Sequence, residues 1–261
     1  MTEVKAIVLR AAGINCDLET QYALELAGAK AERIHINRLI EQKDILDDYQ
    51  IIVFPGGFSY GDDVAAGKIL ANQITHHLYA CVKKFIDDGK VVLGICNGFQ
   101  VLVKAGILPA IGGEKRTDLV TITNNDSGRF DDRWIYLQPG TQKCIFINNG
   151  QRIYLPIAHG EGKVVVKDES VLQTLQNDGH IAFRYVDADG QSGSWPVNPN
   201  GSIDSIAGLT DSTGRVLGLM PHPERFVRKT QHPRWTRIKN GDIADGMTIF
   251  NNAVKYIREN L

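Results

Sequence analysis

Cys96 lies between two glycines, Gly94 and Gly98, at the end of the apolar segment 90–95. A sharp strand-to-helix turn holds its central side chain in a strained conformation, and larger residues two positions away would clash there. The next residues, 97–104, have the pattern of a helix, and the N-terminal end of a helix favours a thiolate. The spacing therefore predicts a nucleophilic cysteine at the tip of a turn. The alternative is a buried structural cysteine after a core strand.

Two His-x-Glu pairs could activate this thiol: His222 with Glu224, and His159 with Glu161. A thiolate that attacks an acyl carbon needs a base, and a carboxylate to orient that base. Side chains at positions i and i+2 of an extended chain point to the same side, so either pair could place its carboxylate behind its imidazole. Prolines on both sides of His222 restrict the backbone, whereas a glycine separates the other pair. We favour His222 and Glu224, and interpret His159 as a turn residue or a substrate contact.

Two backbone amides are candidates for stabilising the oxyanion of a tetrahedral intermediate. The amide of Asn97 follows the nucleophile directly, which suits one such donor. Gly57 follows the apolar segment 50–54, and a glycine lets the main chain approach a ligand closely. A tight turn after a core strand would explain this glycine equally well.

The composition indicates a globular protein, because the 261 residues are 43% hydrophobic and 23% charged, with a formal net charge of −1. Basic residues are not in excess, as they would be in a protein that binds nucleic acid or an anionic membrane, so neither partner is expected. The sequence starts without a signal peptide, and no apolar segment approaches the roughly 20 residues that span a bilayer. We therefore expect a cytoplasmic protein.

The four cysteines, Cys16, Cys81, Cys96 and Cys144, have no paired spacing. They suggest neither a disulfide framework nor a metal site.

The first half of the chain alternates between strand and helix patterns. Such a rhythm predicts an α/β fold with a mostly parallel central sheet and helices on both faces. In such sheets ligands collect at the carboxyl ends of the strands, where both Cys96 and Gly57 would lie. The strands are expected at 4–9, 31–36, 50–54 and 90–95, and the helices at 17–28, 66–88 and 97–104.

From residue 118 onward the pattern changes to short alternating segments, which favour additional antiparallel strands. Helices are expected at 170–177 and 246–258, and the segment 192–201, rich in proline, glycine and asparagine, is expected to form a surface loop. The strands are expected at 118–123, 133–137, 143–147, 152–157, 163–166, 181–186 and 215–220.

Three motifs occur in an order that resembles class I glutamine amidotransferases. They are PGGFSYGD at 55–62, GICNGFQ at 94–100 and PHPER at 221–225. The FSYGD extension, together with PIAHGEG at 156–162 and NPNGS at 198–202, more narrowly resembles the glutaminase subunits of phosphoribosylformylglycinamidine synthases. The resemblance runs from residue 4 to about residue 225, and the combination of motifs is more specific than any one of them.

This resemblance implies a flavodoxin-like fold, with residues 1–261 forming a single type 1 glutamine amidotransferase domain. It also implies that Cys96 attacks the side-chain amide of glutamine, which releases ammonia and leaves a thioester that water hydrolyses. His222 would be the general acid and base, Glu224 would orient it, and the amides of Gly57 and Asn97 would hold the oxyanion.

The resemblance further implies contacts to substrate and partners. Gln100 and Phe58 would shape the glutamine pocket, and we place His159 with them as a substrate-binding residue. The ammonia would pass to a synthetase subunit, with a small accessory subunit, for the conversion of formylglycinamide ribonucleotide to its amidine in purine biosynthesis. ATP and magnesium would bind that partner, since this sequence contains neither G-x-x-x-x-G-K-[ST] nor an acidic metal cluster.

The first strand departs from the family pattern, because the segment before Cys16 lacks the usual Pro-Gly. Cys16 remains a second thiol, expected near the carboxyl edge of the sheet because its loop follows the first strand. The residues alone leave the roles of Arg129, Phe130 and Glu161 open. The other functions considered are a different cysteine-dependent acyl or γ-glutamyl hydrolase, and a non-catalytic regulatory subunit.

Overall fold

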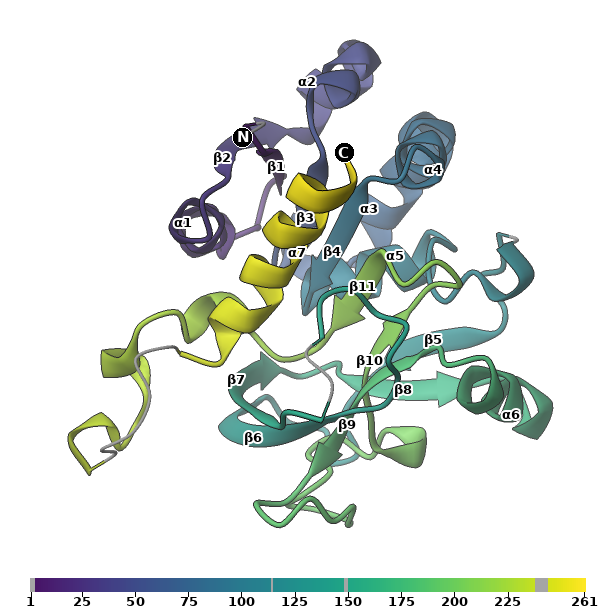
Figure 1. Cartoon of the computed structure of the whole chain (residues 1–261). Coiled ribbons are helices and arrows are strands. Elements are labelled where there is room, and N and C mark those ends of the chain that lie inside the picture. The colour runs from purple at the N-terminus through teal and green to yellow at the C-terminus, as the bar shows by residue number, and fades with distance from the viewer. Residues whose placement is uncertain (1–2, 114, 148–149, 238–243) are drawn as a thin grey trace.

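A nine-stranded mixed sheet forms the centre of the protein, as a computed structural model describes it for residues 3–113, 115–147, 150–237 and 244–261 (Figure 1). In spatial order the strands are β2 (Lys30–His35), β1 (Lys5–Arg10), β3 (Ile51–Phe54), β4 (Val91–Ile95), β11 (Val216–Leu219), β10 (Ile206–Thr210), β9 (Ile181–Val186), β6 (Asp131–Pro139) and β7 (Ile153–His159). The expected α/β class is confirmed.

The half of the sheet from β2 to β11 is parallel. Strands β3 and β4 are buried along their whole length, which explains why they are continuous apolar runs rather than alternating patterns. The carboxyl ends of β1, β3, β4 and β11 lie side by side. The loops that carry Cys16, Gly57, Cys96 and His222 follow these four strands, so the topology gathers them at one edge of the sheet.

The half from β10 to β7 is antiparallel, as the sequence predicts. A separate two-stranded antiparallel sheet pairs β5 (Val120–Thr123) with β8 (Lys163–Val166). The pairing of β11 with β4 is parallel, so β11 is the one strand from the later part of the chain that extends the parallel half among the described residues.

Helices cover both faces of the parallel half (Figure 1). Helices α1 (Asp17–Leu26) and α7 (Gly246–Asn260) pack against each other, and α3 (Lys68–Gln73) packs against α5 (Asn97–Lys104). The other helices are α2 (Ile36–Glu41), α4 (Tyr79–Asp87) and α6 (Glu169–Asn177). Figure 1 shows α7 in yellow, close to the N-terminal strands although it ends the chain.

The expected single helix over 66–88 is instead two helices, α3 and α4, joined by a π-helical turn at Ile74–Leu78. Gly67 adopts a φ of +70°, which delays the helix start to Lys68. A π turn inserts one residue into the helical repeat, and hydrophobic periodicity at 3.6 residues does not reveal such an insertion.

The predicted strand at 143–147 is wrong. This segment forms a turn in which Cys144 and Phe146 are buried, and the amide of Ile145 donates to the carbonyl of Gly214 at 3.0 Å. The alternating apolar side chains of this segment thus anchor a loop against the turn between β10 and β11. The sequence analysis also missed helix α2 and strand β10.

No helix among the described residues is long and apolar enough to cross a membrane.

Candidate active site

Cys96 sits at the junction of β4 and α5 with a φ of +50° and a ψ of −105°, a conformation that L-residues rarely adopt. Its amide donates to the carbonyl of Leu219 on β11 at 2.8 Å, which fixes the turn. A Cβ atom on Gly98 would lie 1.9 Å from the carbonyl oxygen of Phe54, and one on Gly94 would lie 2.9 Å from the carbonyl oxygen of Gly98. The two glycines are therefore sterically required, as expected for a nucleophile-bearing turn.

His222 and Glu224 follow β11, and His222 Nδ1 lies 2.6 Å from Glu224 Oε1. Both side chains are almost completely buried. The amide of His222 donates to the carbonyl of Pro156 on β7 at 2.8 Å, so the loop is attached to the antiparallel half of the sheet. Pro223 begins a short 3₁₀ turn that brings Glu224 back towards the imidazole.

The charge state of His222 is set by its neighbours. Burial alone lowers the pKa of His222, but the Glu224 carboxylate and the Cys96 sulfur outweigh burial, and the pKa lies well above the ordinary 6.5. His222 Nε2 has no hydrogen-bond partner among the described residues. An imidazole with one nitrogen held by a carboxylate and the other free beside a thiol can move a proton to and from that thiol.

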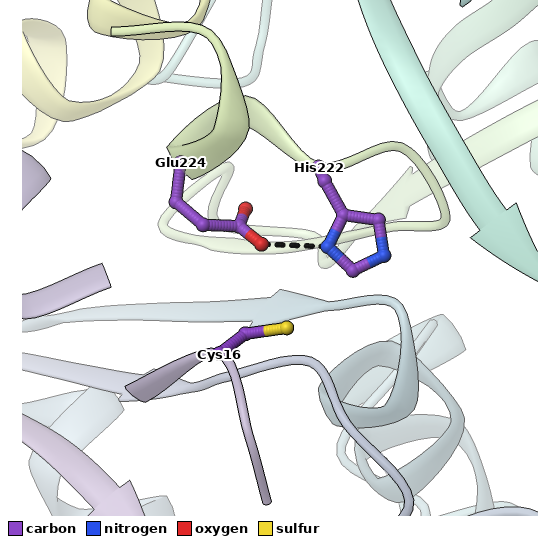
Figure 2. A group of neighbouring side chains, drawn as sticks. All are labelled: Cys16, His222 and Glu224. Atoms are coloured by element: carbon purple, nitrogen blue, oxygen red, sulfur yellow. Dashed lines mark hydrogen bonds and ion pairs between the residues drawn. The ribbon is translucent and has the colours of Figure 1, made fainter. Parts of the chain in front are cut away.

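A second thiol, that of Cys16, faces the same pair, as Figure 2 shows. The Cys16 sulfur, a His222 nitrogen and a Glu224 carboxylate oxygen all lie within 4.8 Å of one another. Burial raises the pKa of the Cys16 thiol, and the neighbouring His222 imidazole opposes this rise. The three residue types could ligate zinc, but Arg225 Nη2 donates to the Cys16 sulfur at 3.2 Å, and a guanidinium there opposes a bound cation.

Gly57 and Asn97 both place backbone amides at this edge of the sheet. Gly57 has a φ of +141°, and a Cβ atom on it would lie 2.7 Å from the amide nitrogen of Asn15, so only glycine fits this turn. Asn97 is the first residue of α5, and the first amides of a helix have no intrahelical acceptor. The amides of both residues are thus suitable donors to an oxyanion.

A cavity of about 230 Å³ opens next to Cys96. This volume suits a single amino acid, since pockets that bind drug-sized ligands measure roughly 300–1,000 Å³. Phe58 and Phe130 are both exposed and lie 6.3 Å apart between ring centroids. The cavity is lined by Gly57, Phe58, Asp62, Ala66, Cys96, Gln100, Asn124, Gly128, Arg129, Phe130, Ala158, His159, Gly160 and Glu161.

Gln100 links two parts of the cavity wall through side-chain hydrogen bonds. Its Nε2 donates to the carbonyl of Glu161 at 2.5 Å, and its Oε1 accepts from Asn97 Nδ2 at 3.0 Å. The same Asn97 group donates to Asp62 Oδ1 at 3.1 Å. Gln100 therefore connects α5 with the loop after β7, as well as lining the cavity.

His159 and Glu161 both line the cavity but bond to different partners, and Glu161 Oε2 accepts from the amide of Ala66 at 3.3 Å. Asn125 holds the ring: its Oδ1 lies 3.1 Å from His159 Nδ1, and its Nδ2 donates to the carbonyls of Arg129 and His159. Burial lowers the pKa of His159 to about 4. A neutral imidazole held by an amide is unsuited to the proton transfers that the His222 pair can perform.

Sequence reasoning missed Asp62 and Asn125 as members of the site. Asp62 has a φ of +54°, and its Oδ1 also accepts from the amide of Gly67 at 3.1 Å. The consecutive Tyr-Gly-Asp in the 55–62 motif was a signal for such a tight turn. Asn125 lies in a polar loop, and nothing local in the sequence distinguishes it from its neighbour Asn124.

Comparisons with known proteins add to this geometry. Residues 3–257 match the family model of CobB/CobQ-like glutamine amidotransferase domains. The chain is 47% identical to phosphoribosylformylglycinamidine synthase subunit PurQ of Dehalococcoides mccartyi over 261 residues, which cover 99% of this chain and 100% of the relative. It is 41% identical to the subunit of the same name from Archaeoglobus fulgidus over 272 residues, 98% of each chain.

Solved structures show the same relationship. A chain in the structure of PurLQS from Thermotoga maritima superposes with a TM-score of 0.74 at 31% identity, covering 98% of this chain and 100% of that one. A glutamine amidotransferase from Thermotoga maritima has a TM-score of 0.52 at 13% identity, covering 99% of this chain and 94% of that one. The second match shows a shared fold alone.

Proposed function

Because this chain belongs to the family of CobB/CobQ-like glutamine amidotransferase domains and is the glutaminase subunit of a phosphoribosylformylglycinamidine synthase, we propose that Cys96, His222 and Glu224 carry out its reaction. The observation that carries this assignment is the geometry at the sheet edge. A strained cysteine borders a cavity sized for one amino acid, and a buried histidine–carboxylate pair with a 2.6 Å hydrogen bond interacts with its sulfur.

In the acylation step, the Cys96 thiolate attacks the side-chain amide carbon of glutamine, and the amides of Gly57 and Asn97 donate to the oxyanion. Protonated His222 gives its proton to the departing nitrogen, which leaves as ammonia, and a thioester remains. Water then attacks the thioester, with His222 as the base, and the C–S bond breaks to release glutamate. Glu224 orients the imidazole and stabilises its protonated form throughout.

The cavity walls carry complementary charges for the α-amino and α-carboxylate groups of glutamine. The lining residues include two acidic ones, Asp62 and Glu161, and one basic one, Arg129. Burial raises the pKa of Asp62, although hydrogen bonds from Gly67 and Asn97 oppose the shift. We assign the carboxylates to the ammonium group and Arg129 to the carboxylate, while Phe58, Gln100 and His159 shape the remaining wall.

Arg129→Met should raise the KM for glutamine about 10- to 100-fold with little change in kcat, because a charge-assisted hydrogen bond contributes roughly 1.5–3 kcal/mol. Steady-state glutaminase kinetics measure both constants. Arg152→Met is the matched control, since Arg152 is also exposed but lies outside the cavity lining. Equal effects of the two substitutions would contradict the assignment of Arg129.

The overall reaction is tested by supplying the assembled synthase with either glutamine or ammonium. We expect amidine formation from both nitrogen sources, with glutamine hydrolysis weak in the isolated chain and strongly increased by the synthetase partner and its nucleotide substrate. Amidine and glutamate are quantified in the same samples. Glutaminase turnover that is equal with and without the partner would contradict coupled assembly of the site.

ATP and Mg²⁺ belong, in this proposal, to the synthetase subunit, where the amide oxygen of formylglycinamide ribonucleotide is activated. The chain's own part is to release ammonia beside that partner, and we place the complex in the cytoplasm. The relatives over the full chain disfavour the two other functions considered, a separate acyl hydrolase and a silent regulatory subunit.

A further inference from the structure

Cys16 is a fully buried residue that the proposed reaction does not use. It precedes α1, and its backbone amide donates to the carbonyl of Gly56 in the loop that also carries Gly57. A Cβ atom on Gly56 would lie 2.7 Å from His222 Cε1 and 3.2 Å from the Cys16 sulfur. The sulfur is therefore packed at the same place as the imidazole ring, as Figure 2 shows.

The Cys16 sulfur has two hydrogen-bond contacts besides its contact with the histidine. It donates to Asn15 Oδ1 at 3.3 Å and accepts from Arg225 Nη2 at 3.2 Å. Arg225 comes from the 3₁₀ turn that also carries Glu224, and its Nε lies 3.9 Å from Glu224 Oε1. The arginine is thus held between a thiol and the catalytic carboxylate, although 36% of its side chain remains exposed.

Glu224 is a carboxylate that a nearby cation would stabilise. Its side chain is completely buried, and Oε2 has no hydrogen-bond partner among the described residues. An ionised carboxylate away from water is costly unless nearby charges compensate it. His222 bonds to Oε1, and Arg225 is the second positive group beside the same oxygen.

We propose that Cys16 is a positioning residue, whose sulfur holds the Arg225 guanidinium beside Glu224 so that this carboxylate stays directed at His222. This inference rests on the proposed function of the His222–Glu224 pair. A long arginine side chain with partial exposure can otherwise turn into solvent at little cost. The sulfur acts through Arg225 and Glu224 and takes no part in bond formation.

Cys16→Ala in the assembled synthase should lower kcat for glutamine hydrolysis about 10- to 100-fold, as small misplacements of catalytic groups do, while leaving KM nearly unchanged. Cys16→Ser keeps an acceptor for the guanidinium and should recover most of that loss. Arg225→Met should reproduce the effect of Cys16→Ala. The double variant Cys16→Ala/Arg225→Met should be no slower than Arg225→Met alone, since both changes remove one interaction.

Cys144 provides the matched control, because it is also a buried cysteine but lies outside the site, in the turn at 143–147. Its alanine and serine variants should lower thermal stability without changing kcat. Independent, multiplicative losses at Cys16 and Arg225, or equal kcat values in the alanine and serine variants of Cys16, would overturn the inference. A wild-type complex without glutamine hydrolysis would instead contradict the proposed function itself, so the two failures are distinguishable.

Discussion

Replacing Cys96 by alanine is expected to reduce glutamine hydrolysis by about 10⁴-fold or more, because no thioester can form without the sulfur. The assembled synthase should still make the amidine from ammonium, since the synthetase chemistry does not require this thiol. Glutaminase and ammonium-dependent rates of the same preparation measure the two outcomes.

The control for this prediction is Cys144→Ala, which removes a buried thiol away from the site. A circular dichroism spectrum and a thermal midpoint establish that the Cys96 variant is folded. Replacement at Cys96 should be tolerated by the fold, because the strained turn is held by Gly94, Gly98 and the amide contact to Leu219 rather than by the thiol. Substantial glutamine turnover by Cys96→Ala would contradict the assigned nucleophile.

Replacing His222 by alanine is expected to reduce kcat by about 10⁴-fold, because both the proton transfer to ammonia and the activation of water depend on its imidazole. Glutaminase kinetics at saturating glutamine measure this effect. His159→Ala is the comparison, since His159 is also buried and in the cavity wall but bonds to Asn125 rather than to a carboxylate. A loss at His159 as complete as the loss at His222 would reverse the choice between the two pairs.

The raised pKa of His222 makes the folding stability depend on pH, and the direction of this dependence can be worked out. The folded state binds the His222 proton more tightly than the unfolded chain, so this pair contributes stability that is fully present below the unfolded value near 6.5. That contribution is lost as the pH rises through the folded pKa. Glu224→Gln removes the main cause of the raised pKa and should flatten this part of the curve, as thermal midpoints between about pH 5 and 9 would show.

The strand-to-helix turn at Cys96 and the pair of His222 and Glu224 were predictable because their signals are local. Gly94 and Gly98 are fixed by contacts within a few residues of Cys96 or with the neighbouring strand, and the prolines around His222 restrict its own backbone. The alternation of strands and helices likewise followed from short-range periodicity. The spacing of these residues could therefore be recognised before it was known which strands are neighbours.

Features that depend on distant contacts were not predictable. The alternating pattern of segment 143–147 predicts a strand, but the buried side chains of this segment anchor a turn against Gly214. The contact between Cys16 and Arg225 joins residues that are 209 positions apart in the sequence. The hydrogen bond between Asn125 and His159 joins residues that are 34 positions apart. Such partners are brought together by the order of strands in the sheet, which periodicity alone does not specify.

The most direct test of the central claim is mass spectrometry of the intact protein after treatment with 6-diazo-5-oxonorleucine, an electrophile that mimics glutamine. We expect a single adduct that peptide mapping places on Cys96, and that glutamine prevents. The reaction is run on the chain in its synthetase complex, where the site is assembled. An adduct on Cys16 in place of Cys96, or labelling of Cys96 that glutamine fails to prevent, would contradict that claim.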